Sequence, residues 1–171
     1  VDFEEYKIYH VYNRTNNNEK LFRSDHNRNF FLNRYKKYIS YLADCFCWCL
    51  LSNHFHFLIR IKSEKSIRKY LRQQGLKNQT VQEKRFLANQ ISCSELVESA
   101  FKRMFQSYAM AFNKCYKRNG NLFYKPFKRV LVDKESQFTQ AIIYIHANPV
   151  KHGLVDSFEL CKWSSWNRIM F

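Results

Sequence analysis

The sequence predicts an α+β fold of ferredoxin-like connectivity, an antiparallel sheet with helices packed mainly on one face. Two neighbouring runs rich in aromatic and apolar residues, 45–51 and 55–61, are joined by the polar pair Ser52-Asn53, which suits a tight hairpin. Segments with apolar residues at helical spacing precede and follow this hairpin, and a further strand-like run stands near each end of the chain. The element order is therefore β-α-β-β, helix, β, helix.

The part of the chain before the hairpin supplies one strand and one helix. Residues 6–13 read as the first strand because aromatic and β-branched side chains dominate them. A polar loop containing Asn16, Asn17 and Asn18 follows, and helical spacing starts at Asp25, which we expect to be the N-cap. The apolar positions of this helix are Phe30, Phe31, Tyr35, Tyr38 and Leu42.

Residues 62–84 are charged, and we expect a short helix at residues 66–73 followed by a mobile segment. A long helix capped by Ser94 should run to about Arg118 and end at Gly120. Its apolar stripe comprises Phe101, Phe105, Tyr108, Phe112 and Cys115.

The last predicted strand covers residues 127–132, and the last predicted helix is capped by Asp133 and stopped by Pro149. The residues expected to face inward from this helix are Phe138, Ala141, Ile142 and Ile145.

Composition favours one globular domain spanning residues 1–171 that binds nucleic acid. Hydrophobic residues make up 46% of the chain, which is enough to form a packed core. Gly (3) and Pro (2) are scarce, so a flexible linker is not expected. The net charge of +15 creates a positive field that a polyanion would neutralise, and nucleic acid is the default partner. An acidic membrane surface is the competing partner, but no apolar run approaches the roughly 20 residues that span a bilayer.

The six cysteines suit a reducing cytoplasm, where thiols stay free and fill apolar space, so we expect a cytoplasmic protein. Cys45, Cys47 and Cys49 alternate, which on a strand places all three on one face and Phe46, Trp48 and Leu50 on the other. The paired C-x-x-C spacing of a structural zinc site is missing.

The segment His54-Phe55-His56 is the sharpest chemical feature of the first half. Two residues at i and i+2 on a strand project from the same face, so the two imidazoles could clamp one divalent ion while Phe55 turns into the core. Taken alone, the motif favours two half-buried, hydrogen-bonded strand histidines over a metal site.

Tyr144 and Asn148 lie one turn apart on one flank of the inward face of the last helix. A tyrosine at that margin can rest its ring on the sheet while its hydroxyl reaches a cleft, and Asn148 can offer an oxygen to the same ion. Spacing alone favours an amphipathic tyrosine at the edge of a core.

Four ordered motifs and the first strand carry a resemblance to a known family. They are YHVYNRT (residues 9–15), SNHFHFLI (52–59), YKRNGNLFYKPFK (116–128), YIHANPVKHGLV (144–155) and WSSW (163–166). Together they resemble the single-tyrosine transposases of the histidine–hydrophobic–histidine superfamily, in the branch associated with repetitive extragenic palindromes. Residues 74–93 match no motif of that family.

The resemblance implies cleavage of single-stranded DNA beside a hairpin through a 5′-phosphotyrosine, with one bound divalent ion, Mg²⁺ or Mn²⁺. It places the nucleophile at Tyr144, the metal-binding histidines at His54 and His56, and a further metal ligand at Asn148. The proline after Asn148 makes that last assignment the weakest. A base for the tyrosine proton is not identified: His146 and His152 lie close in sequence, but His146 should point away from Tyr144.

The expected DNA grip is the region where basic and aromatic residues interleave, because cations hold phosphates and aromatic rings stack on unpaired bases. Its residues are Lys114, Lys117, Arg118, Phe123, Tyr124, Lys125, Lys128 and Arg129. A solvated basic turn is the alternative interpretation.

Two alternatives to a transposase remain at this point: a binding module that recognises DNA hairpins without cutting, and a replication-initiating or plasmid-mobilising nuclease. Tyr108, Tyr116 and Tyr124 are rival nucleophiles, although Tyr108 belongs to an apolar stripe. The sequence leaves open whether the protein forms a homodimer.

Overall fold

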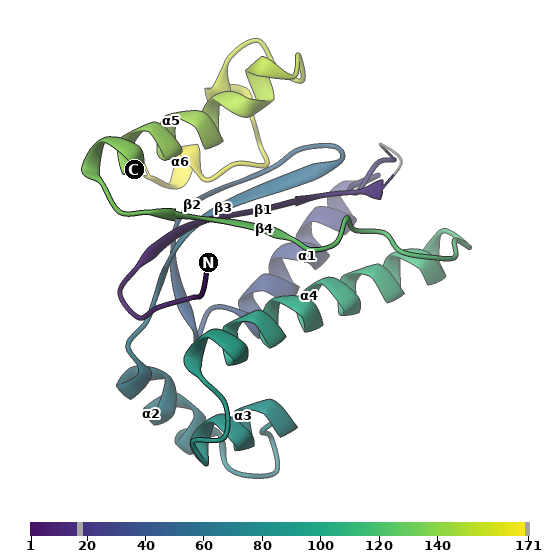
Figure 1. Cartoon of the computed structure of the whole chain (residues 1–171). Coiled ribbons are helices and arrows are strands. Elements are labelled where there is room, and N and C mark those ends of the chain that lie inside the picture. The colour runs from purple at the N-terminus through teal and green to yellow at the C-terminus, as the bar shows by residue number, and fades with distance from the viewer. Residues whose placement is uncertain (17–18, 170–171) are drawn as a thin grey trace.

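The computed structural model describes residues 1–16 and 19–169, and it confirms the predicted α+β fold class. Four antiparallel strands form one sheet in the order β2-β3-β1-β4 (Figure 1). The strands are β1 (Ile8–Arg14), β2 (Ala43–Leu50), β3 (His54–Ile61) and β4 (Lys128–Val132). With α1 after β1 and α4 before β4, this order gives the ferredoxin-like connectivity. The predicted turn residues Asn17 and Asn18 lie outside the described part.

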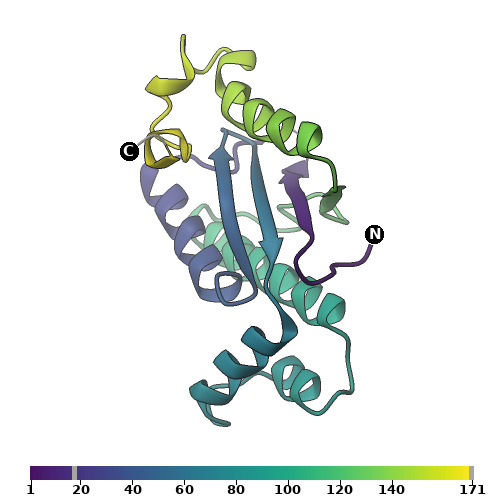
Figure 2. The same cartoon turned by 90° about the vertical axis from the view of Figure 1, so that its left-hand side faces the viewer.

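Two long helices cover one face of the sheet, and a third lies across the other face (Figures 1 and 2). Helices α1 (Asp25–Tyr38) and α4 (Cys93–Cys115) pack side by side beneath the sheet, whereas α5 (Glu135–Lys151) lies above β2 and β3. None of the helices within residues 1–16 and 19–169 is both long and apolar enough to cross a membrane.

The alternation of the two central strands, β1 and β3, divides the sheet into an apolar face and a polar face. Phe55, Phe57 and Ile59 of β3 are fully buried, and the two phenylalanine rings contact aromatic residues of α1 and α4. Their neighbours His54 and His56 point to the face that carries α5 because successive side chains of a strand project oppositely. The largest core therefore anchors the strand that presents both histidines.

The charged region between the hairpin and the long helix is more ordered than predicted. It contains α2 (Glu64–Gln74) and also α3 (Val81–Leu87), in place of the expected mobile segment. A capping box between Thr80 and Glu83 starts α3, and Phe86 of α3 is fully buried. Seven residues with one apolar anchor give little periodicity, so the sequence pattern did not reveal this helix.

All three predicted N-caps are displaced by one or two residues. Ser24 caps α1 instead of Asp25, and Ser92 caps α4 through a capping box with Glu95 instead of Ser94. Lys134, and not Asp133, occupies the N-cap position of α5. Tertiary contacts decide two of these cases.

The hydroxyl oxygen of Ser94 accepts a hydrogen bond from the backbone N–H of Phe3 at 2.9 Å, which ties the N-terminus to α4. The carboxylate of Asp25 accepts from Lys162 Nζ and Trp163 Nε1 at 2.6 and 2.8 Å. Both side chains thus hold distant segments instead of capping a helix.

The ends of two helices also differ from the predictions. Pro149 does not stop α5, which continues to Lys151. Only the last turn follows the proline, and there the carbonyl of Asn148 still accepts a hydrogen bond from the N–H of His152. Helix α4 ends at Cys115 rather than near Arg118, and the side chain of Cys115 is exposed instead of completing the apolar stripe. Gly120 lies in the loop beyond, with a φ of 86°.

A β-bulge between Cys45 and Cys47 breaks the predicted alternation of the cysteines. Cys47 and Cys49 are buried on the α5 face, and the partly buried Phe46 packs on the same face, where it contacts Phe138 of α5. Cys45 is exposed. The expectation that the three thiols share one face and Phe46 the other is therefore wrong.

The C-terminal segment runs along the outer edge of β2 and ties α5 to the sheet. Leu50 N donates to Trp163 O, Ser165 N donates to Trp48 O, and Ser165 Oγ accepts from Trp48 N at 2.8 Å. His146 of α5 lies 3.0 Å from the same Ser165 hydroxyl. The WSSW motif (residues 163–166) thus forms a structural strap that holds α5 against the sheet. It follows η2 (Phe158–Leu160) and leads into α6 (Trp166–Ile169).

Candidate functional site

The candidate site lies between the polar face of the sheet and the side of α5. Within the sheet, Tyr12 of β1 stands directly opposite His56 of β3, and Arg14 stands opposite His54. His10 lies two positions along β1 on the same face, and its Nε2 is 2.8 Å from Nδ1 of His56. Three imidazoles from two adjacent strands therefore form one cluster.

The two histidines of the His-x-His motif stand nearly perpendicular to each other. Their ring centroids are 5.2 Å apart, with an interplanar angle of 88°. Nδ1 of His54 lies 2.7 Å from Oδ1 of Asn53, and Nδ1 of His56 is taken by His10. Nε2 of His56 is buried and has no hydrogen-bond partner among the described residues. In both rings the Nδ1 atom is occupied, which leaves Nε2 for a ligand.

Burial keeps these imidazoles neutral. Desolvation lowers the pKa of His54 to about 4 and that of His56 to about 2, with further lowering by the neighbouring histidines. Desolvation also lowers the pKa of His10 to about 4. A neutral imidazole is the form that coordinates a metal ion, so no proton has to leave at pH 7.

Tyr144 projects from α5 over this cluster. Its ring centroid lies 5.6 Å from that of His56 and 5.9 Å from that of His10, both edge-to-face. The side chain is 42% exposed, and its hydroxyl makes no hydrogen bond to any described residue. Lys151 Nζ stands 5.4 Å from the ring centroid. The phenol therefore rests on the histidines while its oxygen stays open to solvent.

Asn148 lies one turn after Tyr144 but is buried, with 1% of its surface exposed. Its Nδ2 donates to the carbonyl of Tyr144 at 2.8 Å, so its Oδ1 is the only atom left for an ion. No three His, Cys, Asp or Glu side chains in the described part of the chain converge in a way that could hold a metal. A bound ion would thus have only two imidazole ligands and would need Asn148, water or phosphate as well.

Two residues of the site, His10 and Arg14, were missed by the sequence reasoning, and a third, His152, was given no role. His10 contacts both His56 and Tyr144, the ring of His152 lies 5.0 Å from that of His54, and Arg14 lies close enough to help lower the pKa of His54. The alternation His10, Tyr12, Arg14 in the first strand was a usable signal, because those three positions share one face.

Two of the three rival tyrosines have hydroxyls that are hydrogen-bonded elsewhere. Tyr108 is buried and donates to the carbonyl of Leu21, and Tyr116 donates to Oδ1 of Asn27. Tyr124 is exposed, but its ring lies under the guanidinium of Arg14 at 5.1 Å. As expected, His146 points away from Tyr144, towards Ile142 O and Ser165.

The predicted DNA grip divides into exposed and internally bonded residues. Phe123 is a core residue with 6% exposure, so it offers no ring for stacking in this conformation. Arg129 lies over the ring of Phe3 and bonds to the carbonyl of Val1 and to Glu98. The members with exposed side chains are Lys114, Lys117, Tyr124, Lys125 and Lys128.

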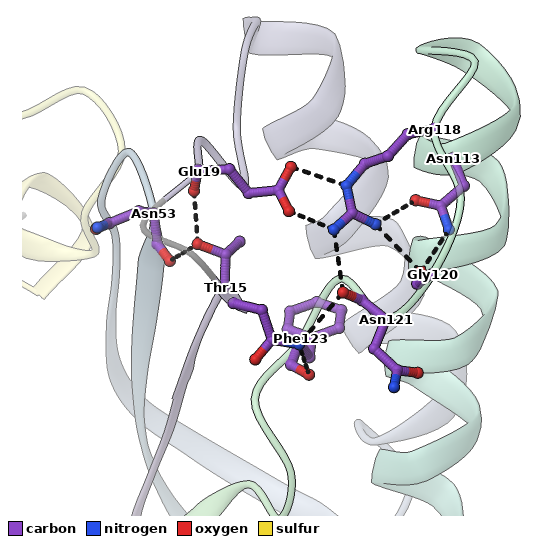
Figure 3. Close-up of polar contacts among 9 residues, drawn as sticks. Thr15, Glu19, Asn53, Asn113, Arg118, Gly120, Asn121 and Phe123 are labelled. Atoms are coloured by element: carbon purple, nitrogen blue, oxygen red, sulfur yellow. Dashed lines mark hydrogen bonds and ion pairs between the residues drawn. The ribbon is translucent and has the colours of Figure 1, made fainter.

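Arg118 serves as a loop anchor (Figure 3). Its guanidinium pairs with the carboxylate of Glu19 and donates to Oδ1 of Asn113 and to the carbonyls of Gly120 and Asn121. All these donors are spent within the protein, so the contacts of Arg118 hold the loop after α4 against the loop after β1.

A groove of about 1080 Å³ lies between α4 and the loop that leads into β4. Aromatic rings and amide groups line it, and the cations at its rim include Lys102, Lys125 and Lys128. Asn13 of β1 also lines the groove, and the next residue, Arg14, faces the histidine cluster. Because successive side chains of a strand project oppositely, the groove and the cluster lie on opposite faces of the sheet, next to the same end of β1.

The chain has the fold of a tyrosine transposase. It superposes on a REP-associated tyrosine transposase that was solved bound to a REP hairpin, with a TM-score of 0.66. The match covers 98% of this chain and 81% of that chain at 13% sequence identity, a level at which the likeness establishes the fold alone. No family model and no curated protein matches the sequence.

The lowered histidine pKa values predict an acid-labile fold in metal-free protein. Between pH 7 and pH 4 the unfolded chain protonates its histidines, whereas His10, His54 and His56 stay neutral in the folded state. The unfolded state then binds more protons, so the free energy of unfolding falls as the pH falls through this window.

Urea unfolding at several pH values in the presence of EDTA measures this dependence. His56→Asn should make it shallower, because an amide does not titrate, and His26→Asn on the exposed surface is the matched control. Equal slopes in the wild type and His56→Asn would contradict the low pKa of His56.

Proposed function

We propose that this protein is a single-tyrosine transposase that cuts and rejoins single-stranded DNA beside a hairpin. The supporting observation is the position of Tyr144, whose ring packs edge-to-face on His56 and His10 while its hydroxyl stays unbonded. A tyrosine at a mere core margin would not need to lie over a cluster of neutral imidazoles. The tyrosine-transposase fold is consistent with this proposal.

His54 and His56 would hold one divalent ion through their Nε2 atoms, with Asn148 Oδ1 as a further ligand. The buried, unpartnered Nε2 of His56 fits such a role, since an isolated polar atom of this kind is costly unless a ligand compensates for it. When bound, the ion would polarise the scissile phosphate and offset the charge that builds on it. Mg²⁺ accepts few nitrogen ligands, so Mn²⁺ is the better probe in the laboratory.

The hydroxyl oxygen of Tyr144 would attack the scissile phosphorus. A bond forms between phosphorus and the tyrosine oxygen, the bond from phosphorus to the 3′ oxygen breaks, and that oxygen leaves as a free 3′ hydroxyl after taking up a proton. The phosphate ester is conserved in the 5′-phosphotyrosine, so a 3′ hydroxyl can reverse the reaction without ATP. Lys151 Nζ, which lies 5.4 Å from the tyrosine ring centroid, adds a positive charge beside the nucleophile.

The DNA would reach this centre along the end of β1. Lys125 and Lys128 flank the groove next to α4, and Tyr124 and Arg14 lie between that groove and His54. Exposed cations bind phosphates and the exposed ring of Tyr124 can stack on an unpaired base. This path uses the exposed part of the predicted grip and leaves Phe123, Arg118 and Arg129 with structural roles.

Tyr144→Phe tests the covalent step. A single-stranded hairpin substrate labelled 3′ of the cut should give a denaturation-resistant protein–DNA adduct with the wild type, and its 5′ phosphate should map to Tyr144 by peptide mass. The phenylalanine variant should give no adduct but keep its thermal unfolding midpoint, because the hydroxyl makes no hydrogen bond within the described protein. Tyr124→Phe is the matched control and should retain the adduct.

Three other outcomes are informative. An adduct on another tyrosine would refute the site but not the chemistry. Cleavage without an adduct, unaffected by Tyr144→Phe, would refute both. Hairpin binding with neither cleavage nor adduct would favour a non-cutting binding module of the same fold.

The histidine pair is tested by separating cleavage from binding. Changing either His54 or His56 to Ala should abolish cleavage supported by Mn²⁺, because one imidazole ligand is lost. Hairpin affinity should change by no more than a few fold, since phosphate contacts elsewhere supply most of it. Gel-shift titration beside a cleavage assay measures both, and a parallel loss of binding would count against this division of roles.

Lys125 and Lys128 test the DNA path. Replacing both by Ala should weaken hairpin binding and reduce the slope of log affinity against log salt by up to about two units, because two phosphate contacts are lost. The double variant Lys65→Ala, Lys69→Ala on α2 removes two exposed cations at the end of the molecule away from α5 (Figure 1) and should leave the slope unchanged. An unchanged slope for the Lys125 and Lys128 variant would remove this loop from the path.

A further inference from the structure

We propose that His10 is a positioning residue that holds His56 in the tautomer whose Nε2 carries a lone pair, ready to bind a divalent ion. This inference rests on the proposed metal site but concerns a different residue and a different observable. His10 stands outside the His-x-His motif and contacts its second histidine from the neighbouring strand.

The hydrogen bond between His10 and His56 has only two arrangements, because one of the two ring nitrogens must carry the proton and the other must accept it. If His10 Nε2–H donates, Nδ1 of His56 is the acceptor and the proton of His56 must sit on Nε2. That proton would be a buried donor without an acceptor, since Nε2 of His56 has no partner among the described residues. If Nδ1–H of His56 donates instead, Nε2 is an unprotonated ligand.

The companion histidine shows the second arrangement directly. Nδ1 of His54 lies 2.7 Å from Oδ1 of Asn53, and a side-chain carbonyl oxygen can only accept, so His54 must carry its proton on Nδ1. Its Nε2 is then unprotonated. Two independent partners, Asn53 and His10, thus bond to Nδ1 of His54 and of His56, respectively. In both motif histidines Nε2 is left for a ligand. Partners of this kind orient metal-binding imidazoles and raise their basicity.

The sheet fixes the position of His10 without help from a ligand. Strands β1 and β3 pair at the centre of the sheet, and His10 lies diagonally across from His56, beside Tyr12, which stands directly opposite it. The ring of His10 is further bounded by Tyr12 at 4.9 Å and Tyr144 at 5.9 Å. His10 is therefore held on three sides and cannot turn away from His56 without displacing an aromatic ring.

The tautomer itself can be measured in metal-free protein. Two-bond proton–nitrogen NMR correlations of the histidine rings should show a protonated Nδ1 and an unprotonated Nε2 for His56 in the wild type. His10→Gln should preserve this pattern because the glutamine oxygen can accept from Nδ1–H. His10→Leu has similar bulk but no acceptor, and it should give a mixture of tautomers.

The same variants are then titrated with Mn²⁺ and followed by the loss of the free-ion electron spin resonance signal. We expect His10→Leu to bind Mn²⁺ about tenfold to a hundredfold more weakly than the wild type, as is typical when the partner of a metal ligand is removed. His10→Gln should stay within a few fold of the wild type. His26→Gln, a change at an exposed histidine, should have no effect.

A protonated Nε2 on His56 in the wild type would overturn the proposal, and so would equal Mn²⁺ affinities for His10→Leu and the wild type. The NMR result on the wild type decides the tautomer even if His10→Leu fails to fold. Failure of the wild type to bind Mn²⁺, both alone and with the hairpin bound, would instead refute the metal dependence of the proposed function, while the tautomer measurement would still stand. The two failures are therefore distinguishable.

Discussion

The antiparallel pairing of β1 with β3 at the centre of the sheet is the constraint on which the rest of the structure depends. Its register places Tyr12 opposite His56 and Arg14 opposite His54, and its pleat sends Phe55 and Phe57 to the other face. Slipping this pairing by one residue would bury the imidazoles and expose the phenylalanines. Each buried phenylalanine contributes roughly 1.5 to 3 kcal/mol, so the register that builds the core also builds the histidine cluster.

The second requirement is that α5 lies at a fixed position above the cluster. The strap formed by the C-terminal segment fixes this position. Ile145 is fully buried against β2 and β3, while His146 is held between Ile142 O and the hydroxyl of Ser165. Because Ser165 also bonds to the backbone of Trp48, one hydroxyl connects α5 to the edge strand. These two anchors stand next to Tyr144 in sequence and fix the helix rotation that directs its ring onto His56.

The periodicity of the sequence predicted the strands and the faces of the helices. It did not predict the features that depend on tertiary contacts. The four strands, the shared face of His54 and His56, and the side of α5 that carries Tyr144 follow from repeats of two and of 3.6 residues. The bulge at Cys45 and the replacement of Asp25 and Ser94 as caps depend on partners far away in the chain. In the sequence, Phe123 and Arg118 are of the aromatic and basic types expected in a DNA-binding surface. Only the burial of Phe123 and the pairing of Arg118 with Glu19 reveal their structural roles.

The distribution of charge links the ion to the DNA in the proposed function. The protein carries a net charge of +15, yet the imidazoles of the site are kept neutral, so the positive charge near them comes from neighbouring side chains such as Arg14 and Lys151. Two neutral nitrogen ligands alone attract a divalent ion weakly in so positive a field, whereas an arriving phosphate supplies both negative charge and oxygen ligands. Ion binding and DNA binding should therefore strengthen each other by the same factor, because the coupling free energy between two ligands is reciprocal. A site built from His54 and His56 without a carboxylate would in this way fill with metal mainly when its substrate is present.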